Sequence, residues 1–206
     1  MGLLVAAAGQ SRGPKPLAAG ALLVAGARVP DGRFRQAVVL LVYVSEQGAA
    51  GLILNQPGGG PLPKLFPKDD AAKARTDSAS IGGPVGGDNL FCLLRRDGQL
   101  REARAVLPGI YFSTSRDLMQ LALNARLPPS SFRVFQGYSG WNPGQLQREL
   151  AAGLWTVLPG SAAIIFDTDP GTLWTRLHAA GGGASQLHLI PRSLPFARAA
   201  LGPKTF

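Results

Sequence analysis

Residues that could carry out chemistry are few in this chain. The 206 residues include one cysteine and two histidines. Cys92 stands between Phe91 and Leu93, which predicts a buried thiol with a raised pKa and no nucleophilic role. His178 and His188 have a spacing that matches no metal-binding pair, and no acidic cluster accompanies them. We therefore expect core packing for Cys92, and neither a metal nor another cofactor.

Three short patterns resemble catalytic or ligand-binding motifs only in part. The stretch Gly82–Gly87 is glycine-rich, but Pro84 removes a backbone donor and no lysine follows, so a tight turn is expected in place of a phosphate cradle. Gly137–Gly140 resembles a nucleophile elbow, but that motif would require glycine at the position of Trp141. Asp167 and Asp169 precede a predicted helix, and capping explains them better than metal binding does. The sequence therefore predicts no enzyme of a known type.

The segment Gly137–Trp155 gathers two tryptophans, a tyrosine and several glycines around one short predicted helix. Asn142 is expected to cap this helix, and Pro143 suits its first position. Gly153 stands where a left-handed residue would end it. This segment is the first candidate for a functional site.

Six side chains would converge if that helix packed beside the helix expected from Ser113 to about Ala125: Arg116, Asp117, Tyr138, Trp141, Gln145 and Glu149. The functional interpretation is a polar, aromatic-edged groove for a peptide or a small ligand. The structural interpretation is a hydrogen-bonded corner in which Tyr138 and Trp141 anchor the turn. The residues alone favour the structural interpretation.

The pattern of elements indicates an α+β domain. With 27 glycines and 17 prolines, many short strands and tight corners are expected. Strands are predicted at 21–25, 37–44, 49–54, 90–94, 109–112 and 132–135, with a strand end at 80–81, and helices at 113–125, at 143–153 and from about 170. The strand at 37–44 should be central and buried on both faces, and residues 55–78 should form a long surface excursion with one helical turn at 62–66.

One domain is expected at residues 18–180, with a flexible leader at 1–17 and a poorly patterned basic extension at 181–206. No apolar run approaches the roughly 20 residues that span a bilayer, so no membrane association is expected. The single cysteine and the lack of a secretory signal favour a cytoplasmic location.

The net charge of +9 is concentrated at both ends of the chain. Up to Arg35 there are five basic residues and one acidic residue, and after Trp174 there are four basic residues and no acid. Basic ends attract nucleic acid, but they are also common as solvated tails. The second interpretation is favoured, because no aromatic residues alternate with the basic ones.

Five ordered sequence blocks resemble the AlgH/YqgE family of bacterial proteins. The first two are Ala25, Asp31, Phe34, Arg35, Val38 and Val39, and then Gly48, Ala49, Gly51, Asn55 and Pro57. The others are Gly82-Gly83-Pro84, Thr114-Ser115-Arg116-Asp117, and Gly137, Tyr138, Trp141, Gly144, Gln145, Leu146 and Glu149. The resemblance implies an α+β fold with a bifurcated, barrel-like, mostly antiparallel sheet flanked by about three helices, in a cytoplasmic protein. It implies no reaction or cofactor, although some members are linked to transcriptional control of exopolysaccharide production.

Three hypotheses follow. The first is a non-enzymatic regulatory or interaction protein that binds a protein partner. Its candidate surface is Asn55, Gly82, Gly83, Pro84, Arg116, Asp117, Tyr138, Trp141, Gln145 and Glu149. The second is a nucleic-acid-associated protein that binds through its basic ends. The third, an enzyme of unrecognised type, has no motif in its support.

Overall fold

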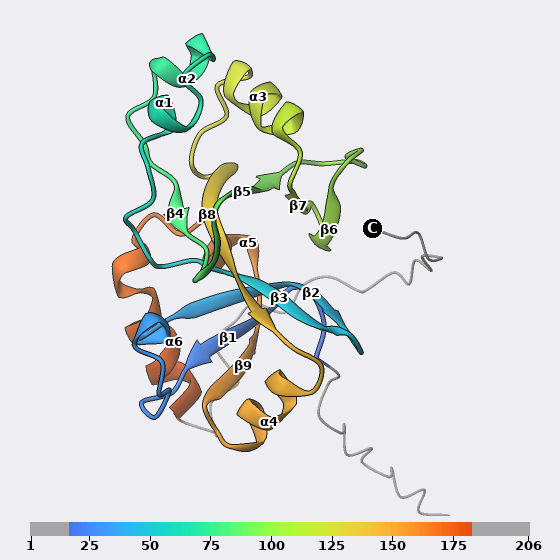
Figure 1. The fold of residues 1–206 in the computed structure, drawn as a ribbon, viewed down its shortest axis with the longest axis vertical. Helices are drawn as coiled ribbons and strands as arrows, with labels where there is room; N and C mark the ends of the chain where they lie inside the picture. Colours follow the sequence, from blue (N-terminus) through green and yellow to red (C-terminus); the bar gives the residue numbers. More distant parts are fainter. Residues whose placement is uncertain (1–16, 183–206) are drawn as a thin grey trace, which may run out of the picture.

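A mostly antiparallel sheet of nine strands forms the centre of the protein (Figure 1). The computed structural model describes residues 17–182. The strands are β1 Ala21–Ala25, β2 Val38–Ser45, β3 Gly48–Ile53, β4 Ser80–Ile81, β5 Val85–Arg95, β6 Arg104–Leu107, β7 Ile110–Ser113, β8 Phe132–Trp141 and β9 Trp155–Pro159. Their order is β6-β7-β5-β8-β3-β2-β1-β9, and β4 pairs in parallel with β8.

Strand β8 belongs to both halves of the sheet. Its first part pairs with β5, from Phe132 opposite Leu94 to Gln136 opposite Leu90. Its last part, Ser139–Trp141, pairs with β3. Gly137 lies between the two parts with φ of 67°, a left-handed conformation that suits glycine. The sheet therefore divides into an upper half (β4–β7) and a lower half (β1–β3 and β9) along one shared strand (Figure 1).

This arrangement confirms the predicted α+β class with a bifurcated, mostly antiparallel sheet. The sheet stays open, because its order ends at β6 on one side and at β9 on the other. Strand β2 is central and fully buried over its first five residues, as its continuous apolar sequence predicts. Strands β6 and β9 were not predicted, because each is short and lacks a run of β-branched residues.

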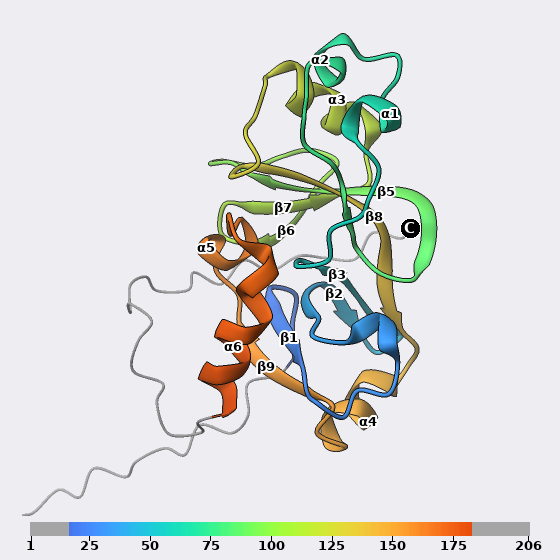
Figure 2. The ribbon, with the colours of Figure 1, turned by 90° about the vertical axis from the view of Figure 1, so that its left-hand side faces the viewer.

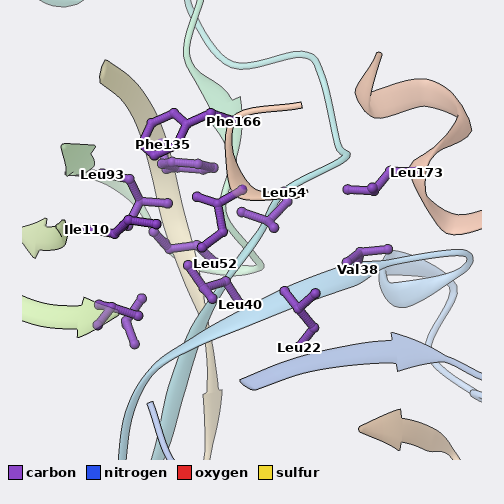
Figure 3. Close-up of a cluster of buried hydrophobic side chains, with 13 residues drawn as sticks. Leu22, Val38, Leu40, Leu52, Leu54, Leu93, Ile110, Phe135, Phe166 and Leu173 are labelled. Carbon is purple, nitrogen blue, oxygen red and sulfur yellow. The ribbon is translucent and has the colours of Figure 1, made fainter. Parts of the chain in front are cut away.

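The two halves share one hydrophobic core (Figure 3). Leu22, Leu40 and Leu52 contribute to it from the lower half. Leu93 and Phe135 contribute from the upper half, and all five side chains are fully buried. A second cluster lies under the helices of the upper half, and a third lies around the tryptophans of the lower half. The shared cluster makes the described chain one domain.

Six α-helices surround the sheet in the described residues: α1 Leu62–Leu65, α2 Asp70–Lys73, α3 Arg116–Asn124, α4 Gln145–Ala151, α5 Ala162–Ile165 and α6 Leu173–Gly182. Helices α3, α4 and α6 are the three that the sequence predicts. Helix α1 lies at the helical turn expected at 62–66, whereas α2 and α5 have only four residues each, too few for an amphipathic pattern to be visible. Two short 3-10 turns, Gly32–Phe34 and Pro170–Thr172, complete the elements.

The stretch 55–78 is not the surface excursion that its polar, proline-rich sequence predicts. It contains α1 and α2, and it buries Leu62, Phe66 and Ala72 against α3 and the upper half of the sheet. The start of α3 at Arg116 also differs from the predicted range 113–125. Ser115 caps the helix, with its hydroxyl accepting a hydrogen bond from the Leu118 amide at 3.3 Å.

Two predicted segments fall outside the described residues. They are the leader, apart from its last residue, and the basic extension beyond residue 182. Within residues 17–182, none of the helices has the length and apolar character that a membrane span requires.

Candidate functional site

The carboxylate of Glu149, on α4, is the centre of the corner that the sequence singles out. Its Oε2 accepts hydrogen bonds from the indole N–H of Trp141 at 2.8 Å and from that of Trp155 at 2.7 Å. Its Oε1 accepts from the Gln145 amide at 2.8 Å. Gln145 in turn accepts from the backbone N–H of Asn142 at 3.1 Å. The corner is therefore a closed hydrogen-bond network.

Three aromatic rings pack beside this network. Trp141 and Trp155 meet edge to face at 6.0 Å between ring centroids, and both are 6 % exposed. Phe34 stacks on Trp141 at 6.3 Å and meets Trp155 edge to face at 5.6 Å. Trp155 ends the segment that the sequence singles out but was not among the six converging side chains, and Phe34 was missed because it comes from a separate segment. These contacts favour the structural interpretation of the corner.

Helix α4 begins two residues later than the sequence predicts. Its first residue is Gln145, and the cap position is held by Gly144 with φ of 70°. Asn142 and Pro143 form the preceding turn, so they are not the cap and the first helical residue. Gly153 follows the helix with φ of 68°, as predicted. The turn at Asn142 and Pro143 lets the Gln145 side chain reach back to the backbone N–H of Asn142.

Three of the other candidate residues have structural contacts. Asn55 accepts from the Val38 amide at 2.9 Å and donates to the Gln36 carbonyl at 2.8 Å. Gly82 and Gly83 are buried where the β4–β5 connection crosses β8. A Cβ at Gly82 would lie 2.2 Å from the Gly137 carbonyl oxygen, so glycine is needed for this close approach. Pro84, which follows, is exposed.

The structure does not bring Arg116 and Asp117 to the corner. Helix α3 packs against α1 and α2 in the upper half, whereas α4 lies at the other end of the molecule (Figures 1 and 2). Both side chains are exposed, and Arg116 donates to the Leu65 carbonyl at 3.2 Å and lies over the Phe66 ring. The expected convergence of α3 and α4 is therefore wrong, because the bifurcated sheet separates them.

A shallow hollow of about 440 Å³ lies beside the corner. We call it the hairpin groove, and its lining residues are Tyr43, Gln47, Gly48, Ala49, Ala50, Val85, Tyr138, Gly140, Trp141 and Asn142. The lining comes from the β2–β3 hairpin, from the end of β8, which pairs with β3, and from the start of β5. Tyr138 is half-buried, with its ring edge to face with Phe91, and Val85 is 41 % exposed. The lining contains no charged side chain.

A second hollow of about 300 Å³ lies between the upper half of the sheet and the segment after α5. Arg133 lines it, and its guanidinium donates to the carbonyls of Ile165 and Leu54 at 2.8 and 2.7 Å and to the Ser80 hydroxyl at 3.2 Å. Burial lowers the pKa of Arg133 to about 10, which leaves it charged at neutral pH. These bonds join β8 to α5, β3 and β4, so the arginine has a structural role.

The remaining reactive groups are in the core. Cys92 is fully buried, and burial raises the pKa of its thiol to about 12, as its apolar neighbours predict. Ser139, the serine of the elbow-like pattern, is also fully buried and donates to the Gly82 carbonyl at 3.1 Å. Within residues 17–182 no group of three or more histidine, cysteine, aspartate or glutamate side chains is placed to hold a metal ion.

Comparison with known proteins places this geometry in a family. A model of AlgH-like proteins matches residues 22–186, which includes every described strand and helix except Ala21, the first residue of β1. The chain belongs to the AlgH-like family. Two AlgH-like relatives are UPF0301 proteins from Chlorobium luteolum and Methylococcus capsulatus. The first is 31 % identical over 182 residues, which cover 88 % of this chain and 95 % of the relative. The second is 36 % identical over 158 residues, which cover 75 % and 86 %.

Solved structures support the same assignment. The solution structure of the AlgH protein from Pseudomonas aeruginosa has a TM-score of 0.68 and 29 % identity, and it covers 84 % of this chain and 94 % of its own. A crystal structure of a protein from Corynebacterium diphtheriae has a TM-score of 0.65 and 20 % identity, with coverage of 78 % and 85 %. The second structure supports the AlgH-like fold alone.

Proposed function

We propose that this AlgH-like chain is a non-enzymatic regulatory protein that binds a partner protein in the hairpin groove. The observation that carries the proposal is the groove itself, an open hollow lined by aromatic, apolar and amide groups. Concave surfaces of this kind, with few polar groups, are typical binding sites. Its lining includes Ala49, Ala50 and Gly140, which are small and leave room for the side chains of a partner.

The chemistry of the lining defines the partner segment. Because the groove has no charged side chain, a charged segment would lose its hydration there without an ion pair in return. An extended, uncharged segment with aromatic, proline or aliphatic residues would bury its side chains against Tyr138 and Val85. We therefore propose an uncharged, extended stretch of a regulatory protein as the occupant.

The Glu149 network supports the proposal by fixing the end of β8, which lines the groove. Trp141 lines the groove, and its indole is fixed by Glu149 and by the rings of Phe34 and Trp155. A wall that is already ordered loses little conformational entropy when a partner binds. In this proposal the sequence block from Trp141 to Glu149 shapes the groove from behind.

Site-specific photo-crosslinking in cells would test the proposal. A photoreactive residue at Gln47, which is exposed on the groove, should capture a defined protein, identified by mass spectrometry. The same residue at Leu121, which is 63 % exposed on α3 in the upper half, should not capture it. Adding Val85→Asp to the Gln47 variant should abolish the capture, since it places a charge in the groove. Capture that is equal at both positions, or unchanged by Val85→Asp, would reject the groove.

Nucleic-acid binding through the basic ends is the alternative, supported by the uneven charge of the sequence. Titrating the full chain with fluorescent duplex and single-stranded oligonucleotides at low and moderate salt would test it. Binding through the ends should weaken steeply as salt rises, because counterion release drives it. Binding that does not depend on salt, or no binding at low salt, would exclude this alternative.

A further inference from the structure

Strand β9 ends the sheet with an edge that carries no charge. Its residues are Trp155, Thr156, Val157, Leu158 and Pro159, and Val157 is 43 % exposed. The opposite edge, β6, is protected differently, since it contains Arg104 and its register with β7 is irregular. Charges and irregular register are common ways of blocking pairing at an edge strand. Strand β9 has neither a charged residue nor an irregular register, and its one protective feature is the proline at its end.

The pairing of β9 with β1 determines which backbone groups point outwards. Gly26 donates to the Leu154 carbonyl at 2.8 Å, and Gly160 donates to the Gly20 carbonyl at 3.0 Å. Because hydrogen-bonded positions alternate along an antiparallel pair, the even-numbered residues of β9 bond to β1. The N–H and C=O groups of Trp155 and Val157 therefore point to the free edge. Within residues 17–182 no backbone group bonds to them.

We infer that β9 pairs antiparallel with β9 of a second copy of this chain, about a two-fold axis at Thr156. In this register Trp155 of each copy faces Val157 of the other as a hydrogen-bonded pair. Both outward N–H groups and both outward carbonyls of each copy then find partners. Pro159, which has no N–H, lies beyond these pairs and removes no bond.

The edge is self-complementary in its side chains as well. Thr156 lies opposite Thr156 of the second copy in a pair without hydrogen bonds, where side chains approach most closely. Facing threonines are a favourable cross-strand pair. The exposed side chain of Val157 would become covered, because it would lie beside Trp155 of the second copy. With no charge in β9, nothing on the strand repels its copy, which favours a second copy over a partner of complementary charge.

A cysteine at the axis gives a direct test. In a pair of this kind the Cα atoms lie about 4.5 Å apart, within the range of a disulfide. The full chain carrying Thr156→Cys should therefore oxidise to a covalent dimer on mild oxidation. Ala163→Cys, an exposed position on α5, is the matched control and should remain monomeric. Native Cys92 does not interfere, because it is fully buried.

The unmodified full chain supplies the second measurement. Sedimentation equilibrium should give the mass of a dimer that dissociates on dilution. Val157→Pro removes an outward N–H without removing a bond to β1, so it should weaken association at least tenfold while the circular dichroism spectrum is kept. A chain that is monomeric at every concentration, or a Thr156→Cys variant that crosslinks no faster than Ala163→Cys, would overturn the inference. Association unaffected by Val157→Pro would also place the interface elsewhere and overturn it.

Discussion

At the scale of single residues, Glu149 fixes two tryptophan side chains by hydrogen bonds. It accepts from two buried indole N–H groups and from Gln145. Glu149→Ala leaves both indoles without an acceptor, and we expect the free energy of unfolding to fall by about 3 kcal/mol. Urea denaturation followed by tryptophan fluorescence measures this change. Gln147→Ala, at an exposed position on the same helix, should shift stability by less than about 0.5 kcal/mol. Equal effects would show that the network contributes nothing.

Cys92 predicts a dependence of stability on pH. Its pKa is about 12 in the folded chain, against an ordinary value of about 9. Between these pH values the unfolded thiol loses its proton and the folded thiol keeps it, so stability falls as pH rises through this window. Below about pH 9 the contribution is fully present, and the slope above it is about 1.4 kcal/mol per pH unit for this group.

The measurement is urea denaturation at several pH values from 8 to 11, ~1 pH unit apart, for the native chain and for Cys92→Ala. The native chain should lose more stability over this range than the variant does. Parallel curves would show that the thiol titrates alike in both states.

The residues also show what local sequence can and cannot reveal. Cys92 was read correctly because its own neighbours bury it. Asn55 and Glu149 were placed on the candidate surface, yet both have structural hydrogen bonds. Asn55 binds the backbone at Gln36 and Val38, which are remote in sequence, and Glu149 binds Trp141 and Trp155 within its own segment. Neither kind of hydrogen bond leaves a periodic pattern in a sequence.

At the scale of elements, the crossing of the β4–β5 connection over β8 depends on glycine. Gly83 has φ of 154°, and a Cβ there would lie 2.3 Å from the Tyr138 carbonyl carbon. Gly83→Ala should therefore destabilise the chain by more than about 3 kcal/mol, because backbone cannot move aside as a side chain can. Gly87→Ala is the control four residues later, where a Cβ meets nothing within 4 Å. Thermal unfolding of the two variants would contradict the expectation if their midpoints agreed.

The elements differ in how visible they are in the sequence. Strand β2 and the β2–β3 hairpin were predicted, because a continuous apolar run followed by a polar turn identifies them. Strand β9 was not, since its five residues follow a helix and end in proline. The apolar stretch from Ala162 became helix α5 because Ser161 caps it, with its hydroxyl accepting from the Ile164 amide. Short elements of this kind are set by caps and by pairing with distant strands.

At the scale of the whole molecule, the shared core predicts a single unfolding transition. Trp141 and Trp155 pack in the cluster of the lower half, and Trp174 packs against that cluster and the shared core, so fluorescence reports mainly the lower half. Far-ultraviolet circular dichroism reports the helices and strands of both halves. Because β8 and the shared cluster join the halves, the two signals should change at the same urea concentration. Separate midpoints would show that the halves unfold independently.

The pairing of β1 with β9 has a consequence for the biosynthesis of the chain. Strand β1 is the first strand to leave the ribosome, whereas β9 is the last of the nine. Until β9 emerges, the backbone groups of Leu22 and Val24 that it later binds have no strand beside them. The lower half therefore completes its sheet only when nearly all of the domain has been translated. Because contacts between distant segments form late, we expect this pairing to slow folding and to leave the nascent chain open to aggregation until β9 has emerged.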